Sequence, residues 1–160
     1  MKEFRGKITA KGRRIGVVVS RFNGHISSRL LEGLKEAFIQ LGGNEEDLEV
    51  FWVPGSFEIP FLLKKLAGSD ESNKKYDGLV GLGCIIRGET PHFDFVASEV
   101  AKGIARISLE QGIPVAFGII TADSLDQALE RAGGKMGNRG RDTLISLLET
   151  IGVTEEIRKG

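Results

Sequence analysis

Four short runs of apolar, often β-branched residues are spaced along the chain, and polar or glycine-rich stretches separate them. In the first run, IGVVVS at residues 15–20, almost every position is apolar, which is typical of a parallel strand buried on both faces. The same pattern predicts strands at residues 48–53 (LEVFWV), 79–86 and 115–121. Residues 3–10 (EFRGKITA) favour an additional edge strand.

Segments with helical spacing of apolar residues alternate with these strands. In residues 25–41, apolar side chains recur every three or four positions, and the pair Gly42-Gly43 supplies a natural stop. Further helices are predicted at residues 56–67, with Ser56 as a candidate cap, and at residues 93–111, 124–132 and 141–151. The polar residues 68–77 are expected to form a surface loop.

An alternation of strands and helices at this spacing implies right-handed crossovers and a parallel sheet covered on both faces. We therefore predict a three-layer α/β/α, flavodoxin-like fold with a four-stranded parallel sheet. The 160 residues have the usual length of one domain, and we expect residues 1–160 to form a single domain. Glycine, at 22 residues, is about twice as frequent as usual, which indicates turns, caps and close backbone contacts.

Composition excludes several classes of function. The chain has 22 Lys and Arg against 22 Asp and Glu, whereas nucleic-acid-binding proteins normally carry a basic excess. No stretch approaches the roughly 20 apolar residues of a membrane span, and the N-terminus has no apolar signal core. The single cysteine, Cys84, excludes an internal disulfide and a cysteine-rich zinc site. We expect a cytoplasmic protein without a metal, a nucleic-acid partner or a membrane partner.

Ligands of such sheets bind outside the carboxyl ends of the strands, which directs attention to the segments that follow them. Phe22 follows the first strand, where its ring either stacks on a planar ligand or folds back onto the core. Glu58 lies in the first turn of a helix after the second strand. Its carboxylate either favours the helix dipole or binds a polyhydroxyl ligand.

The segment RGETPHFD at residues 87–94, after the third strand, is the densest polar cluster at any strand end. It leads into a helix N-terminus, where backbone N–H groups favour an anion such as phosphate. His92 is one of two histidines, and imidazole is a natural proton shuttle near pH 7. His25, in a surface-like turn, is the weaker candidate.

The segment RAGGKMGNRGR at residues 131–141 contains four basic residues and four glycines. It lacks the spacing of a Walker A loop. Either it contacts an anion such as phosphate, or it is a flexible loop with solvated charges. The spacing alone favours the flexible loop.

Five motifs, taken together and in order, carry a family resemblance: RFNGHIS (21–27), VPGSFEIP (53–60), GCIIRGETPHFDFV (83–96), PVAFGIIT (114–121) and QALERAGGKMGNRGRD (127–142). With them the chain resembles the 6,7-dimethyl-8-ribityllumazine synthases of riboflavin biosynthesis. The resemblance implies a transferase that condenses 5-amino-6-(D-ribitylamino)uracil with L-3,4-dihydroxy-2-butanone 4-phosphate through a Schiff base. The products would be the lumazine, phosphate and water, and no cofactor is implied.

The resemblance also implies roles for the residues that match the family motifs. His92 would donate and accept protons. The residues that would bind the ribitylaminouracil are Phe22, Ser56, Phe57, Glu58, Cys84, Ile85, Ile86 and Phe117. Those that would bind the butanone phosphate are Glu89, Thr90, Arg131 and Lys135. Arg87 lies within a motif as a candidate for a structural role.

A homo-oligomer is implied as well. Subunits of the family form pentamers with each active site between neighbours, so Phe117 and Arg131 would come from the adjacent chain. Some members assemble pentamers into a 60-subunit icosahedral shell. Two features favour the shell. The GGKMGNRG segment is compact, and no proline precedes Pro54, which leaves an N-terminal strand free to pair with a neighbour. Riboflavin synthase is a candidate partner of such a shell.

Two other functions use the same fold. A flavin- or nucleotide-binding module is one, although RFNGHIS lacks the hydroxyl-rich loop expected there. A shell protein without catalysis is the other, and the presence of His92, Arg131 and Glu58 argues against it. A riboflavin synthase of the archaeal type, which shares this ancestry, is a related alternative.

Overall fold

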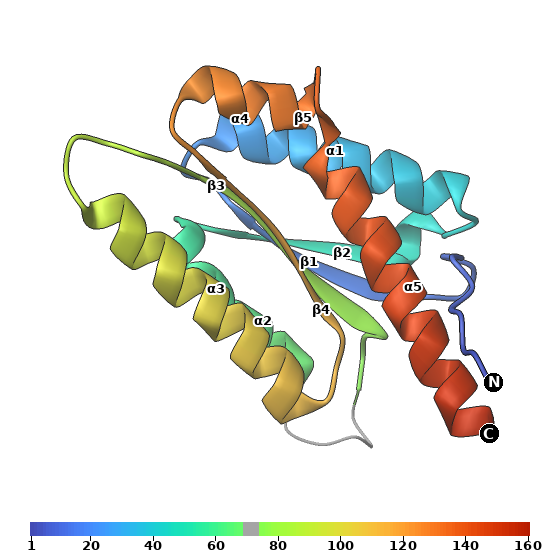
Figure 1. Ribbon diagram of the computed structural model, residues 1–160. Coiled ribbons are helices and arrows are strands. Elements are labelled where there is room, and N and C mark those ends of the chain that lie inside the picture. Colours follow the sequence, from blue (N-terminus) through green and yellow to red (C-terminus); the bar gives the residue numbers. More distant parts are fainter. Residues whose placement is uncertain (69–73) are drawn as a thin grey trace.

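A four-stranded, all-parallel sheet in the order β2-β1-β3-β4 forms the middle layer of the protein. The structure is a computed structural model that describes residues 1–68 and 74–160 (Figure 1). The strands are β1 (Ile15–Ser20), β2 (Leu48–Val53), β3 (Gly78–Ile86) and β4 (Val115–Ala122). All four predicted strands are confirmed to within one residue at each end.

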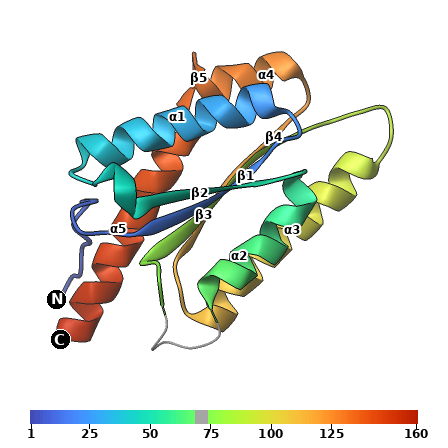
Figure 2. The ribbon, with the colours of Figure 1, turned by 180° about the vertical axis from the view of Figure 1, so that it is seen from behind.

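Helices cover both faces of this sheet, which confirms the three-layer, flavodoxin-like prediction (Figures 1 and 2). One face carries α1 (Gly24–Gln40), α4 (Leu125–Arg131) and α5 (Arg139–Lys159). The other carries α2 (Ile59–Ala67) and α3 (His92–Gln111). None of the described helices combines the length and hydrophobicity that a membrane span requires.

Each face of the sheet has its own apolar core, and β1 contributes to both. Val17 and Val19 pack under α1 and α5, whereas Val18 between them packs under α2 and α3. All three side chains are fully buried. Alternate side chains of a strand point to opposite faces, so a strand covered on both sides must be apolar throughout. This requirement explains the unbroken run that identified β1 in the sequence.

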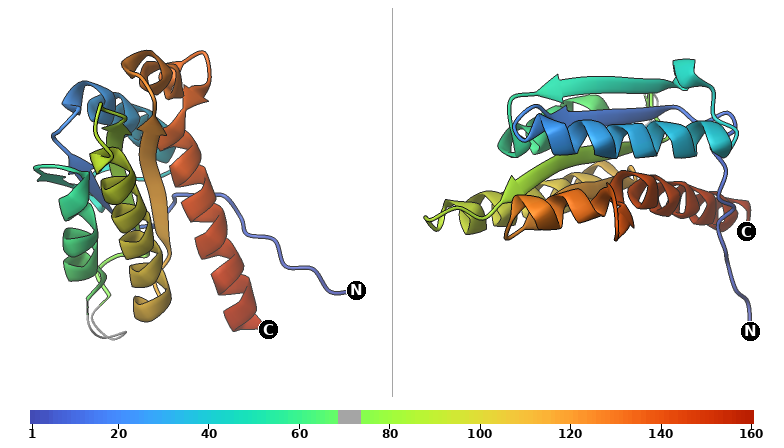
Figure 3. Two further views of the ribbon diagram at one scale, coloured as in Figure 1. Left: turned by 60° about the vertical axis from the view of Figure 1, so that its left-hand side comes forward. Right: turned by 90° about the horizontal axis from the view of Figure 1, so that it is seen from above.

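The chain termini and the short turns differ from expectation. The predicted edge strand at residues 3–10 does not form within the single chain, since none of residues 1–14 is in a strand. Figure 3 shows the N-terminal segment running outward as an extended trace. Ser56 does not cap a helix: it opens a 3₁₀ turn (Ser56–Glu58) ahead of α2, and Gly55 occupies the capping position. Residues 69–73 of the predicted polar loop lie outside the described residues.

The glycine-rich segment before α5 is more ordered than the flexible loop that its spacing favoured. It forms a small antiparallel hairpin of β5 (Ala132–Gly134) and β6 (Gly137–Asn138). The last helix begins directly after this hairpin and extends beyond the predicted residues 141–151 at both ends. A further 3₁₀ turn (Glu45–Asp47) precedes β2.

Asn138 fixes the start of α5 against α1. Its Oδ1 accepts hydrogen bonds from the backbone N–H of Gly140 at 2.8 Å and of Arg141 at 3.2 Å, which caps the helix. Its Nδ2 donates to the Arg29 carbonyl of α1 at 3.0 Å. A Cβ at position 140 would overlap the carbonyl oxygen of Leu30, so only glycine permits this close approach.

We predict that Gly140→Ala destabilises the protein by about 2–4 kcal/mol, because α5 must move away from a rigid backbone carbonyl. Gly24→Ala is the matched control, since a Cβ there meets no heavy atom within 4 Å. Urea denaturation at one fixed protein concentration measures both variants. Equal denaturation midpoints would contradict the close-contact explanation.

Candidate active site

A cavity of about 340 Å³ opens at the carboxyl ends of β1, β2 and β3. It lies where the strand order reverses, since the chain moves from β1 to one side for β2 and to the other for β3. Most of the predicted site residues line it. The lining residues are Phe22, Gly55, Ser56, Phe57, Glu58, Cys84, Ile85, Ile86, Gly88, Thr90, His92, Phe93 and Val96.

The turn after β1 holds an aromatic ring at the mouth of this cavity. Two backbone hydrogen bonds join the turn to the end of β2, Arg21 N–H to the Val53 carbonyl at 2.8 Å and Phe22 N–H to the Pro54 carbonyl at 2.9 Å. The Phe22 side chain is 71% exposed, so the alternative in which its ring folds back onto the core is excluded. A ring held in this way offers a flat face to a planar ligand.

Asn23 ties the same turn to β3. Its backbone is left-handed, with φ at 54°, a conformation that asparagine tolerates better than most residues. Its Nδ2 donates to the Cys84 carbonyl at 2.9 Å. The hydrogen bond therefore crosses the switch point between β1 and β3. Sequence reasoning missed this residue, although an asparagine before a glycine in a strand-end turn is a recognisable indication.

Glu58 places a carboxylate beside Phe22. An ideal Cβ on Gly55 would lie 3.4 Å from Glu58 Oε2 and 4.0 Å from Phe22 Cβ, so the carboxylate and the ring flank the same backbone segment. The Glu58 side chain is exposed and makes no capping hydrogen bond to α2. Its position therefore leaves its oxygens available to a ligand that carries hydroxyl groups.

Ser56 lies directly against β3 because residue 83 is glycine. A Cβ at position 83 would come within 2.6 Å of the Ser56 hydroxyl oxygen and 2.9 Å of the Ser20 hydroxyl oxygen. Ser20 and Ser27 hydroxyls in turn lie 3.2 Å apart in the buried region under the turn. Ser56 thus joins the cavity lining to a small, buried polar cluster of Ser20 and Ser27, which close packing at Gly83 permits.

Cys84 contributes to the cavity through its backbone. Its side chain belongs to the buried cluster under α1 and α5, and burial raises the pKa of the thiol to about 11. Its carbonyl accepts the Asn23 hydrogen bond described above. A thiol with this pKa stays protonated at neutral pH and is a poor nucleophile.

The segment from Arg87 to His92 forms the outer rim. Figure 1 shows it arching away from the sheet between the end of β3 and the start of α3. His92 is the first residue of α3 and lines the cavity together with Thr90. Glu89 is exposed and lies outside the lining. Among the described residues, no group of three or more His, Cys, Asp or Glu side chains gathers as a metal site would require.

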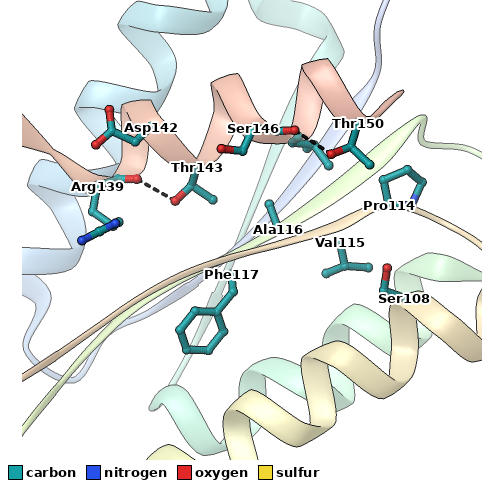
Figure 4. Close-up of a pocket in the computed structure, with 11 residues that line it drawn as sticks. Ser108, Pro114, Val115, Ala116, Phe117, Arg139, Asp142, Thr143, Ser146 and Thr150 are labelled. Atoms are coloured by element: carbon teal, nitrogen blue, oxygen red, sulfur yellow. Dashed lines mark hydrogen bonds between the residues drawn. The ribbon is translucent and has the colours of Figure 1, made fainter. Parts of the chain in front are cut away.

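Phe117 and Arg131 do not reach this cavity. They line a second cavity of about 250 Å³ on the outer side of β4, together with Ile119, Ile120, Thr121 and Arg139. Phe117 and Arg139 also line an adjoining groove of about 300 Å³ between α3 and α5. Figure 4 shows Arg139 and Phe117 toward one end of this groove, and Pro114 and Thr150 toward the other.

The chain matches a known protein family over most of its length. Residues 12–155 match the sequence model of the 6,7-dimethyl-8-ribityllumazine synthase family. The chain belongs to this family. Lumazine synthases are transferases of riboflavin biosynthesis, so the chain is an enzyme of that pathway. The match includes both the His92 cavity and the Phe117 cavity, and thus every residue singled out in the sequence.

The site residues predicted from the sequence fall into three groups. One lines the His92 cavity, a second (Phe117 and Arg131) lines the Phe117 cavity, and a third (Glu89 and Lys135) lines neither. The strand-end prediction correctly brings together the residues from β1, β2 and β3, and it leaves out Phe117 and Arg131. Lys135 lies exposed in the β5–β6 turn and lines neither cavity, whereas Arg139 lines the Phe117 cavity beside Arg131. The family motifs singled out Arg131 and Lys135 among the four basic residues of that segment and left out Arg139.

We predict that iodoacetamide labels Cys84 in the native lumazine synthase at least about a hundredfold more slowly than in the urea-unfolded chain at pH 8. The raised pKa leaves about two orders of magnitude less thiolate than an exposed cysteine has, and burial restricts access further. Mass spectrometry of timed samples measures both rates. A native rate within tenfold of the unfolded rate would contradict the buried placement.

Proposed function

We propose that this lumazine synthase condenses 5-amino-6-(D-ribitylamino)uracil with L-3,4-dihydroxy-2-butanone 4-phosphate. The products are 6,7-dimethyl-8-ribityllumazine, phosphate and water. One observation carries the proposal: a single cavity contains an exposed aromatic ring, an available carboxylate and a histidine at a helix N-terminus. These groups match a planar pyrimidine, its ribityl hydroxyls and a phosphate-bearing partner that reacts by proton transfer.

The ribitylaminouracil occupies the inner part of the cavity. The Phe22 ring stacks on the pyrimidine, and Glu58 accepts hydrogen bonds from ribityl hydroxyls. Ser56 and Phe57 complete the ribityl side, and the backbone of Cys84, Ile85 and Ile86 faces the ring edge. None of these interactions requires an organic cofactor or a metal.

The butanone phosphate occupies the rim near the start of α3. The free N–H groups of this 20-residue helix, together with Thr90, favour its phosphate, and Glu89 lies in the same loop. The 5-amino group attacks the ketone, and loss of water from the carbinolamine gives the Schiff base. Loss of a proton and of phosphate follows, and the ribitylamino nitrogen then closes the ring with loss of a second water.

His92 moves protons in these steps. It accepts a proton as the amine attacks and returns it to the departing hydroxyl, and it serves the later elimination in the same way. General acid–base catalysis of this kind contributes typically 10²- to 10⁴-fold. The remaining acceleration comes from holding the two substrates together.

A second subunit completes the site. Phe117, 41% exposed on edge strand β4, and Arg131 line a different cavity from His92 in the same chain, and among the described strands β4 has no partner on its outer side. Trp52, Phe57 and Phe95 add large exposed aromatic surfaces, which mark interaction sites. The β4 side of one subunit thus closes the His92 cavity of the next, and it brings Arg139 and Arg131 to the phosphate.

The assembly that we propose is a pentamer with one site at each subunit interface, built further into a 60-subunit icosahedral shell. Residues 3–10 pair with an exposed β2 edge of a neighbouring subunit, which accounts for the absence of a strand there within one chain. The compact β5–β6 hairpin supports the shell. Residues 1–160 act as one cytoplasmic domain, with riboflavin synthase as the partner. A light-scattering mass of a free pentamer would contradict the shell.

The experiment that tests this function mixes both substrates with the purified protein and follows lumazine fluorescence. Product formation well above the uncatalysed rate is expected. A rate equal to the uncatalysed rate would refute the enzyme assignment, and tight flavin binding without turnover would favour the binding module. Riboflavin formed from the lumazine alone would identify a riboflavin synthase instead.

We predict that Arg131→Ala and Arg139→Ala each raise the KM for the butanone phosphate about tenfold or more, because each removes a charged phosphate contact. Lys135→Ala should raise it less, and Arg141→Ala is the matched control, since Arg141 bonds Gln40 at 3.0 Å and lines neither cavity.

His92→Ala should lower kcat about ten- to a hundredfold without abolishing turnover. An unchanged kcat would remove His92 from its role.

Subunit mixing tests the shared site directly. His92→Ala and Arg131→Ala subunits, co-assembled in equal amounts, should regain about a quarter of the wild-type sites, because each interface draws its two faces independently. The measurement is the rate of the co-assembled protein against the mean of the two variants assembled separately. A rate no higher than that mean would show that both residues serve a site within one chain.

A further inference from the structure

Arg87 sits at the root of the loop that carries Thr90 and His92, and its side chain contacts two other elements, the end of β4 and the first turn of α3. Its Nε donates to Asp123 Oδ1 at 2.9 Å, at the end of β4. Its Nη1 lies 3.5 Å from Asp94 Oδ2 in the first turn of α3. Its guanidinium stacks on the Phe93 ring with 4.4 Å to the centroid. We refer to this set, Arg87, Phe93, Asp94 and Asp123, as the arginine strap.

The strap holds both residues that follow His92. Phe93 and Asp94 come directly after it in the chain, and Phe93 also lines the cavity. Within the described residues, no hydrogen bond fixes Gly88, Glu89 or Thr90, and all three are exposed. The contacts of Arg87 at one end of the loop and of Phe93 and Asp94 at the other are therefore the restraints on its shape.

Asp123, at the β4 end of the strap, is followed in the chain by the helix that carries Arg131. The Asp123 N–H donates to Gln127 Oε1 at 2.9 Å, and Arg131 Nη1 donates to the Gln127 carbonyl at 3.0 Å. The Arg87 N–H also bonds the Ala122 carbonyl at 2.9 Å, which keeps the ends of β3 and β4 in register. A continuous set of contacts thus runs from the His92 loop to the helix that carries Arg131.

We infer that Arg87 is a positioning residue for the phosphate-bearing substrate, which it never touches. This inference rests on the proposed function, in which Thr90, the α3 N-terminus and Arg131 bind that substrate. Arg87 fixes one end of the loop, and its contacts with Phe93 and Asp94 fix the other, so its loss loosens Thr90 and the start of α3, which are both assigned to the phosphate.

The contacts that hold the pyrimidine side are separate from those that Arg87 makes. Phe22 is held by its own backbone bond to Pro54, and Asn23 by its bond to Cys84. Ser56 lies in the 3₁₀ turn packed on β3; it lines the cavity together with Phe93, but none of the Arg87 contacts includes it. A change at Arg87 therefore affects one substrate selectively, and a general loss of structure would not have this effect.

The test uses Arg87→Gln, which removes the charge and the fork of donors. We expect the KM for the butanone phosphate to rise about five- to tenfold and kcat to fall, with the KM for the ribitylaminouracil unchanged within twofold. Arg106→Gln is the matched control, because Arg106 also pairs through Nε with a carboxylate, Glu110 at 2.6 Å, on the exposed face of α3. Arg87→Lys keeps the charge without the planar fork, so it should recover only part of the loss.

Asp123→Asn provides a second route to the same answer and covers the case in which Arg87→Gln fails to assemble. It should give the same selective change, and in the Arg87→Gln background it should add little, because one strap is already broken. Three outcomes would overturn the inference. They are equal changes in the KM values of both substrates, additive losses in the double variant, and kinetic constants of Arg87→Gln equal to those of the Arg106→Gln control.

Hydrogen exchange separates this inference from the proposed function. If the wild-type protein makes no lumazine, the proposed function fails, and amide exchange over residues 88–94 still tests the strap. Faster exchange there in Arg87→Gln than in Arg106→Gln supports the positioning role. Identical exchange in the two variants refutes it.

Discussion

The parallel pairing of β1 with both β2 and β3 is the constraint on which the rest of this protein depends. Parallel strands require crossover helices, and those helices cover both faces, so the central strands must be apolar on both sides. Val17, Val18 and Val19 meet this requirement in consecutive positions. The pairing also brings the carboxyl ends of three strands to one edge of the sheet. A crevice forms there because the strand order reverses at β1, with β2 on one side of it and β3 on the other.

That crevice has its shape because a few polar contacts hold the strand ends together. Asn23 bridges β1 and β3 with one hydrogen bond from a left-handed backbone, and Gly83 lets the Ser56 hydroxyl lie against β3. The Phe22 ring at the mouth is exposed, and the Glu58 carboxylate beside it does not cap α2. In a folded protein, an exposed phenylalanine next to an available carboxylate is more consistent with ligand binding than with stability.

In the assembly that we propose, the open edge of the sheet lets a neighbouring subunit complete the site. Within the described residues, β4 has helices above and below it but no strand on its outer side, and it carries Phe117, with Arg131 and Arg139 close by. In that proposed assembly, a neighbouring subunit that covers this edge would remove apolar surface from water and at the same time deliver two cations to the phosphate. Assembly and catalysis then depend on the same surface, and the arginine strap links that surface to the His92 loop within each subunit.

Sequence alone determined the strands, the order of the layers and the residues at the strand ends, because periodic apolar patterns and strand-end polar residues are local properties. The family motifs, which are equally local, singled out His92, Phe22 and Glu58. Other features depend on contacts between segments far apart in the chain. Only the tertiary structure showed that Arg139, and not Lys135, lines the Phe117 cavity. It also showed that the glycine-rich segment forms a hairpin, that Asn138 caps α5 after it, and that residues 3–10 form no strand within one chain. It also placed Arg87 between Phe93, Asp94 and Asp123, since a strap across three elements exists only once β3, α3 and β4 have packed together.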